Sequence, residues 1–290
     1  MSAVLNTNTA SLWAAKNLLG AQNRLAASVE RLSSGLRINR ARDDAAGLGV
    51  ANSLTAQING ANQGMRNLND AISMVQTAEG AIAAASEMGQ RILMLATQGA
   101  NGTLGTTERQ AIIDEMEELL SSINSISART KFSGNSLLNV ATNASATGVA
   151  FSAQISNEAA DKIDLLNPAF FNIGTGANSQ ATALNTAVST LAGAITTANF
   201  QSVQTAANAF VVNLGTQRAL LGAYQNQMDY TLANITELSS NLSSARSRVI
   251  DTDYASETAA LTRGQILQQA ATAMLAQANQ MPNVILTLLK

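Results

Sequence analysis

Apolar residues recur every seven positions along the second half of the chain. Between residues 203 and 249 the positions of one stripe lie alternately three and four residues apart, and few of them are polar. A heptad repeat of this length predicts one long helix that packs along its whole length on other helices. The stripe consists of Leu214, Leu221, Met228, Ile235, Leu242 and Val249, with Tyr224, Leu238 and Ala245 between them and Gln217 and Thr231 as polar exceptions.

The first half of the chain carries two matching stripes. Residues 99–107 between them are rich in Gly, Asn and Thr, which predicts a turn between two helices. Three long helices with matching apolar faces predict a helical bundle. The first stripe is Ile58, Ala61, Met65, Leu68, Ile72, Val75 and Ile82, and the second is Ile112, Met116, Leu119, Ile123 and Ile126.

Both ends of the chain carry further stripes at helical spacing. No third helix lies nearby in the sequence to cover them, so we expect the two ends to pair with each other. Two core helices of one globule would show the same periodicity, and the pattern does not decide between the two. The stripes are Leu5, Leu12 and Leu19, widened by Leu18, Leu25 and Leu32, and Leu267, Ala271, Met274, Ala278, Met281, Ile285 and Leu288.

The middle of the chain loses the heptads. Residues 133–190 are rich in Gly, Asn, Ser, Thr and Ala, whereas residues 148–155 and 162–166 show the alternation of strands and predict a small β-hairpin. Residues 174–180 are predicted to be a loop. The predicted fold is mainly α: an elongated antiparallel helical bundle with a terminal coiled coil and a small β-hairpin.

The composition removes most chemical functions. The chain has no His and no Cys, so the usual general base, the cysteine nucleophile, soft metal sites and disulfides are all missing. A net charge of −2 argues against nucleic-acid binding. The start of the chain has no signal-peptide pattern, and residues 284–289 are too short an apolar run for membrane insertion. We expect no enzyme, no cofactor and no metal; Asp251, Asp253 and Glu257 fit a helix start better than a metal site.

Two segments resemble the terminal signatures of bacterial flagellins. Residues 30–47 read ERLSSGLRINRARDDAAG, and residues 244–257 read SARSRVIDTDYASE, followed by QILQQA at 265–270 and LAQANQMP at 275–282. Residues 1–135 and 200–290 share the resemblance. Arg40 and Arg42 stand where many flagellins carry Ser and Lys, and little room remains at 136–199 for the outer domains that many flagellins insert. The chain thus resembles a short, core-only flagellin.

The resemblance implies a structural subunit of the flagellar filament that polymerises through its paired terminal helices. It implies an inner domain of residues 1–44 with 248–290 and an outer domain of residues 45–247, with the hairpin near 136–175. We expect the ends to stay mobile until neighbouring copies cover their apolar sides. The expected polymerisation seam is Leu5, Leu12, Leu19, Leu267, Met274, Met281, Ile285 and Leu288. The alternatives are a hook–filament junction protein of the same superfamily and a secreted helical adhesin or effector.

The resemblance also implies partners and a location. Flagellins are exported unfolded through the flagellar secretion apparatus without a cleaved signal peptide, shielded at the C-terminus by a cytosolic chaperone, and assemble with flagellar cap and junction proteins outside the cell. Residues 90–101 resemble the segment by which many flagellins engage a host Toll-like receptor. The matching positions are Gln90, Arg91, Leu95 and Glu115, although Met94 replaces an acidic residue common there. A surface ion pair between Arg91 and Glu115 is the alternative interpretation.

Overall fold

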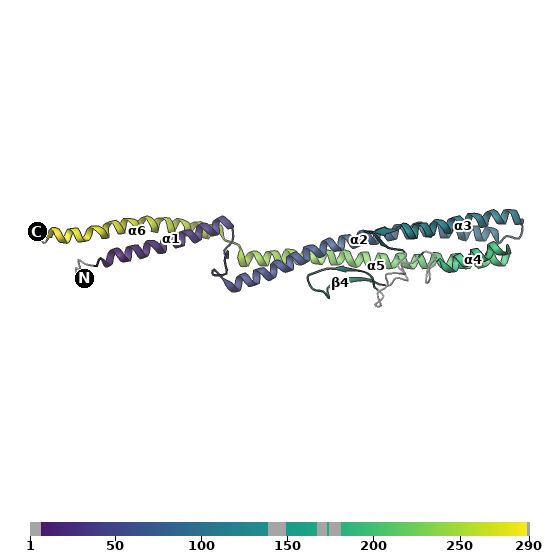
Figure 1. Cartoon of the computed structure of the whole chain (residues 1–290), viewed down its shortest axis with the longest axis horizontal. Coiled ribbons are helices and arrows are strands. Elements are labelled where there is room, and N and C mark those ends of the chain that lie inside the picture. Colours follow the sequence, from purple (N-terminus) through teal and green to yellow (C-terminus); the bar gives the residue numbers. More distant parts are fainter. Residues whose placement is uncertain (1–6, 139–148, 167–172, 174–180, 289–290) are drawn as a thin grey trace. The chain divides into compact units, whose positions relative to one another are not determined.

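The computed structural model describes residues 7–138, 149–166, 173 and 181–288, with the backbone alone at residues 149, 150, 166 and 281–288. This described part is mainly helical, as predicted, and carries a small β-hairpin (Figure 1). Its helices are α1 (Thr9–Ser34), α2 (Ala45–Gly99), α3 (Thr106–Arg129), α4 (Thr182–Gly193), α5 (Thr197–Ile250) and α6 (Tyr254–Leu288). Its strands are β1 (Lys131–Phe132), β2 (Asn135–Ser136), β3 (Val149–Gln154) and β4 (Lys162–Leu166).

The chain divides into two compact units. We call Met1–Ala56 with Asn241–Lys290 the terminal unit, and Gln57–Ser240 the central unit. Both ends of the sequence therefore belong to one unit. The domain boundaries expected from the sequence, after residues 44 and 247, fall inside the terminal unit, and that division stays a prediction.

The core of the central unit lies between α2, α3 and α5. The heptad positions of α5 that are buried there include Leu214, Leu221 and Met228, so the predicted long helix and its inward face are confirmed. Leu238 was predicted in the same stripe but is 47 % exposed. The other largest fully buried side chains of this core include Phe200, Phe210, Leu68, Ile82, Ile92, Ile113, Met116 and Ile123.

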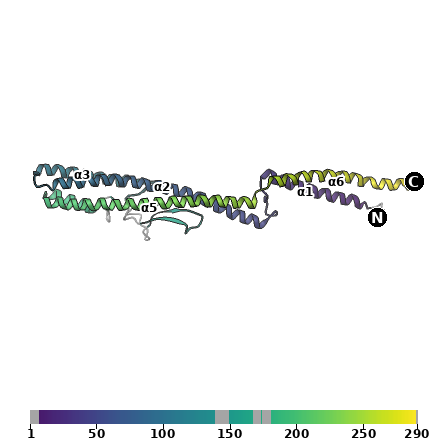
Figure 2. The same ribbon diagram turned by 180° about the vertical axis from the view of Figure 1, so that it is seen from behind.

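The predicted hairpin is formed by β3 and β4, which pair antiparallel with Ala153 opposite Ile163. Figure 2 shows it lying against the long helices of the central unit. Its backbone comes so close to α2 that a Cβ on Gly64 would overlap the Ile155 carbonyl oxygen. Asn67 on the next turn donates a 2.9 Å hydrogen bond from Nδ2 to the Gln154 carbonyl oxygen. A glycine and an amide on α2 thus fix where the hairpin docks.

Helix α4 and the strands β1 and β2 were not predicted. Helix α4 buries Leu184, Val188 and Leu191 in the central core, and β1 pairs with β2 as a two-residue ladder. The loop predicted at residues 174–180 lies outside the described residues.

Candidate assembly surface of the terminal helices

The two ends of the chain pair as antiparallel helices, as predicted. Near one end of the pair, Asn8 Nδ2 donates a 2.8 Å hydrogen bond to the Ala278 carbonyl oxygen. Near the other end, Arg31 Nη1 lies 3.6 Å from Glu257 Oε2. Figure 1 shows α1 and α6 running side by side.

Small residues occupy the fully buried positions of the interface between α1 and α6, where Leu25 is half-buried against Gly264. Ala14, Ala21 and Ser28 recur every seven residues and are the buried positions of α1. On α6, Gly264 and Ala278 are buried. Small side chains let two helices approach closely, because a helix pair without further layers can bury only a narrow stripe. Leu12, Leu19 and Leu267 lie outside this buried stripe and stay exposed.

A tight turn anchors the base of the pair. Gly35 ends α1 with φ of 71°, a left-handed conformation that favours glycine. The chain then bonds to the end of α5 and to the connection before α6: Arg37 N–H donates to the Ile250 carbonyl oxygen (2.6 Å), and Thr252 N–H donates to the Gly35 carbonyl oxygen (2.9 Å). This turn joins the end of α1 to the connection between α5 and α6.

Acidic residues at this base hold main-chain amides. The Asp43 carboxylate accepts hydrogen bonds from the N–H groups of Arg40 (2.9 Å) and Asn39 (3.2 Å). The bond from Arg40 holds the pKa of Asp43 below its ordinary value. Asp253 accepts hydrogen bonds from the N–H groups of Ala255 and Ser256 and so caps α6. Asp253 thus serves the helix start.

The expected polymerisation seam is exposed wherever its side chains are described. Leu12 is 66 % exposed, Leu19 is 61 % exposed, Leu267 is 41 % exposed and Met274 is 63 % exposed. Leu5 lies outside the described residues, and the side chains of Met281, Ile285 and Leu288 are likewise not described. Exposed apolar side chains in such a row are unusual for a monomer and mark an interaction surface.

Sequence reasoning missed a groove on the terminal pair. An open groove of about 540 Å³ lies between α1 and α6. Trp13, which is 68 % exposed, stands on the α1 side, and Leu267 and Met274 stand on the α6 side. Alanines supply much of the remaining lining, and Arg24 also borders the groove. Trp13 falls outside the heptad stripe of Leu12 and Leu19, so the heptad pattern gives no signal for it.

The residues that resemble a receptor-binding segment lie on α2 and α3. Arg91 Nε donates a 2.8 Å hydrogen bond to Glu115 Oε1, and Arg91 Nη2 forms an ion pair with the same oxygen at 2.7 Å. Both side chains are about half exposed, and Gln90 is exposed beside them. Leu95 is 2 % exposed and packs in the core of the central unit. The exposed members of the set are therefore polar or charged.

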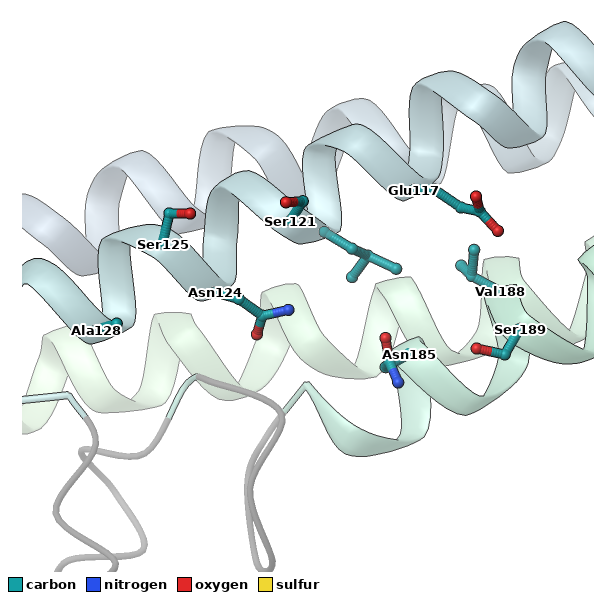
Figure 3. Close-up of a pocket in the computed structure, with 9 residues that line it drawn as sticks. Glu117, Ser121, Asn124, Ser125, Ala128, Asn185, Val188 and Ser189 are labelled. Atoms are coloured by element: carbon teal, nitrogen blue, oxygen red, sulfur yellow. The ribbon is translucent and has the colours of Figure 1, made fainter.

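A polar crevice of about 510 Å³ lies between α3 and α4 in the central unit (Figure 3). Figure 3 shows Asn124 from α3 and Asn185 and Ser189 from α4 reaching into the space between the two helices. The Asn124 Oδ1 atom is buried without a hydrogen-bond partner. The lining has neither a basic residue nor an aromatic ring, so it offers no strong recognition of an anion or of a sugar face.

The described residues contain neither a membrane-spanning helix nor a metal-ion cluster. No helix there combines the length and the hydrophobicity that crossing a bilayer requires. No group of three or more Asp and Glu side chains there is arranged to hold a metal ion.

The fold and the surface together define a helical structural protein whose paired chain ends present uncovered apolar side chains. The model of the bacterial flagellin N-terminal helical region matches residues 5–143, and that of the C-terminal helical region matches residues 201–289. The chain belongs to the bacterial flagellin family.

Full-length relatives agree with this assignment. Polar flagellin F of Vibrio parahaemolyticus is 32 % identical over 376 aligned residues that span both chains completely. A flagellin of Halalkalibacterium halodurans is 37 % identical and covers 99 % of this chain and 100 % of its own. A putative flagellar hook-associated protein from Vibrio parahaemolyticus has a TM-score of 0.56 at 15 % identity, covering 70 % of this chain and 95 % of its own, which shows a likeness of fold alone.

The protein is therefore a structural subunit of the bacterial flagellar filament, an extracellular assembly. The two family models and the full-length flagellin relatives do not favour the hook–filament junction protein or the secreted adhesin.

Proposed function

We propose that filament subunits polymerise by covering the exposed apolar side chains of the α1–α6 pair. Leu12, Leu19, Leu267 and Met274 carry this proposal, because all four stay accessible when α1 and α6 are already paired. Leu5, Met281, Ile285 and Leu288 continue the same heptads in the sequence and extend the proposed seam.

The energetics favour folding of the ends together with assembly. Ordering a residue costs about 1–2 kcal/mol in backbone entropy, and the narrow α1–α6 interface, whose fully buried positions are small residues, offsets little of that cost. Burying a large aliphatic side chain returns about 1.5–3 kcal/mol. Neighbouring copies supply this burial, so the terminal helices become stable in the polymer.

Polymerisation of matched variants tests this proposal. The L12S/L19S variant removes apolar area from the seam, and the L12M/L19M variant keeps it. We expect seeded L12S/L19S to stay in the supernatant after ultracentrifugation, whereas L12M/L19M sediments as wild type does. Filaments of normal length and yield from L12S/L19S would refute the proposed seam. Circular dichroism of both monomers checks that the central unit remains folded.

We also propose the export route that the family resemblance implies. The chain leaves the cell unfolded through the flagellar secretion apparatus, with no cleaved signal peptide, and a cytosolic chaperone covers the α6 stripe until then. The absence of cysteine and the presence of only two prolines suit an unfolded passenger. We expect the purified chaperone to bind the full chain and to lose affinity for L267S/M274S; unchanged affinity would contradict this role. Cap and junction proteins are its further proposed partners outside the cell.

A host Toll-like receptor is a further proposed partner, at Gln90, Arg91 and Glu115. Leu95 is buried, so in this proposal it holds the helix that presents Arg91 and makes no direct contact. A central arginine contact is worth more than about 1.4 kcal/mol, so R91A is expected to weaken receptor binding at least about tenfold. An E87A variant, on the same exposed helix, serves as the matched control. Equal binding by R91A would leave Arg91 and Glu115 as an ordinary surface ion pair.

We further propose that the two domains have different roles in the filament. The inner domain of residues 1–44 with 248–290 forms the polymerising part, and residues 45–247 form the outer part. We infer a purely structural role without catalysis, because a chain without His or Cys lacks the commonest catalytic side chains.

A further inference from the structure

The exposed apolar side chains of the terminal pair lie on two opposite faces. Successive helical residues turn by about 100°, so Leu12 and Leu19 point well away from the buried Ala14 and Ala21 in one rotational sense. Trp13 is turned away from the same buried face in the other sense. The two leucines are absent from the groove lining that contains Trp13. We call Leu12 and Leu19 the ridge.

Side-chain bonds locate the ridge on the face opposite the groove. Ser11 Oγ hydrogen bonds to Asn279 Oδ1 at 2.9 Å, on the ridge side of α1 and on the polar side of α6. Leu267 and Met274 leave α6 toward the other side, where they border the groove with Trp13. The pair therefore presents a leucine ridge on one face and an apolar groove on the other.

An open polymer requires each copy to carry two different contact surfaces that face in opposite directions. A contact between identical patches closes into a dimer, whereas a contact between two different patches leaves one of each free and continues. Each copy of this chain carries one ridge and one groove, so a ridge-to-groove contact can repeat without end.

The ridge also fits the groove in spacing. Leu12 and Leu19 are seven residues apart, and so are Leu267 and Met274, so both rows repeat every two helical turns. Lys16 lies between Leu12 and Leu19 on the same face of α1, so the match rests on the apolar side chains alone.

We propose that Leu12 and Leu19 of one copy insert into the groove between Trp13, Leu267 and Met274 of a second copy. This inference rests on the proposed function, since it names the mating surfaces within the proposed seam. It makes the contact directional: each copy uses α1 as the inserted element and the α1–α6 groove as the receiving element.

Disulfide cross-linking tests the pairing, because the chain has no cysteine of its own. Filaments of L19C/M274C and of L12C/M274C are oxidised and resolved on a non-reducing gel. We expect at least one of them to give a ladder of covalent multimers, whereas each single variant stays monomeric and a mixture of L19C with M274C stops at dimers. L19C/Q269C, which moves the second cysteine to an exposed position outside the groove, is the matched control.

Dimers from L19C alone, or a ladder equally strong with Q269C, would overturn the ridge-to-groove contact. If L12S/L19S fails to polymerise but cross-linking gives one of these two results, the proposed seam still stands and only the ridge-to-groove contact is refuted. The two proposals therefore fail separately.

The chain's single tryptophan gives a second readout without cysteines. Trp13 stands at the groove and is 68 % exposed. We expect its emission to shift to shorter wavelength, and its quenching by acrylamide to fall severalfold, when monomers polymerise. Equal quenching of Trp13 in monomer and filament would show that the groove stays empty and would overturn the proposal.

Discussion

At the scale of single residues, Gln217 is the clearest departure from an apolar core. It lies in the α5 stripe between Leu214 and Leu221 and is 3 % exposed, and neither its oxygen nor its nitrogen has a hydrogen-bond partner. An unsatisfied buried polar group costs about 1–3 kcal/mol. We expect Q217L to raise the free energy of unfolding by about that amount in urea denaturation. Q201L, at an exposed position of the same helix, should change it little, and destabilisation by Q217L would contradict this account.

Gly64 is the residue on which the hairpin position depends most. Its missing Cβ leaves room for the Ile155 backbone, whereas a Cβ on Gly80 of the same helix would meet nothing within 4 Å. We expect G64A to displace β3 and β4 and to speed proteolysis of residues 149–166. G80A is the control, and it should stabilise α2 by about 0.5–1 kcal/mol. Unchanged proteolysis in G64A would show that the hairpin has another anchor.

At the scale of elements, long helices were predictable and short or weakly patterned ones were not. The heptads of α5 extend over many turns, so one exposed position such as Leu238 does not obscure them. Helix α4 offers only Leu184, Val188 and Leu191 as a signal, in a segment where Asn, Thr and Ala favour several structures.

The terminal surface was predictable in part. The periodicity indicated that both ends form apolar helices, and the structure pairs them. It could not indicate that Ala14 and Ala21 would face the partner helix while Leu12 and Leu19 stay exposed, because a heptad pattern does not distinguish packing within a chain from packing between chains. The groove depends on the juxtaposition of two helices at opposite ends of the sequence, which no local pattern encodes.

The loop before α2 should respond to acid through Asp43. Its pKa is lowered in the folded chain by the Arg40 N–H, so the ionised form stabilises the fold. This contribution is complete above the ordinary pKa of about 3.9 and is lost as the pH falls through the lowered folded value. We expect the thermal midpoint to fall less steeply below pH 4 in D43N than in wild type. D70N is the control, since Asp70 caps no loop, and identical pH profiles for D43N and wild type would contradict this role.

At the scale of the whole molecule, the two units have different tasks. The central unit has a core of its own between α2, α3 and α5, with large side chains such as Phe200 and Phe210 buried in it. The terminal unit buries Ile38 and Ile250 but leaves Trp13, Leu12 and Met274 exposed, and the fully buried positions of its α1–α6 interface are small residues. We propose that such a filament subunit folds its central unit alone and completes its terminal unit only among other copies.

Amide hydrogen exchange of monomer and filament tests this account most directly. The account predicts that α1 and α6 exchange within seconds to minutes in the monomer and gain protection of several orders of magnitude in the filament. Residues of the central core, such as those around Leu68 and Leu221, should be protected in both states. Equal and strong protection of α1 and α6 in the monomer would contradict the claim that neighbouring copies complete the fold of the chain ends.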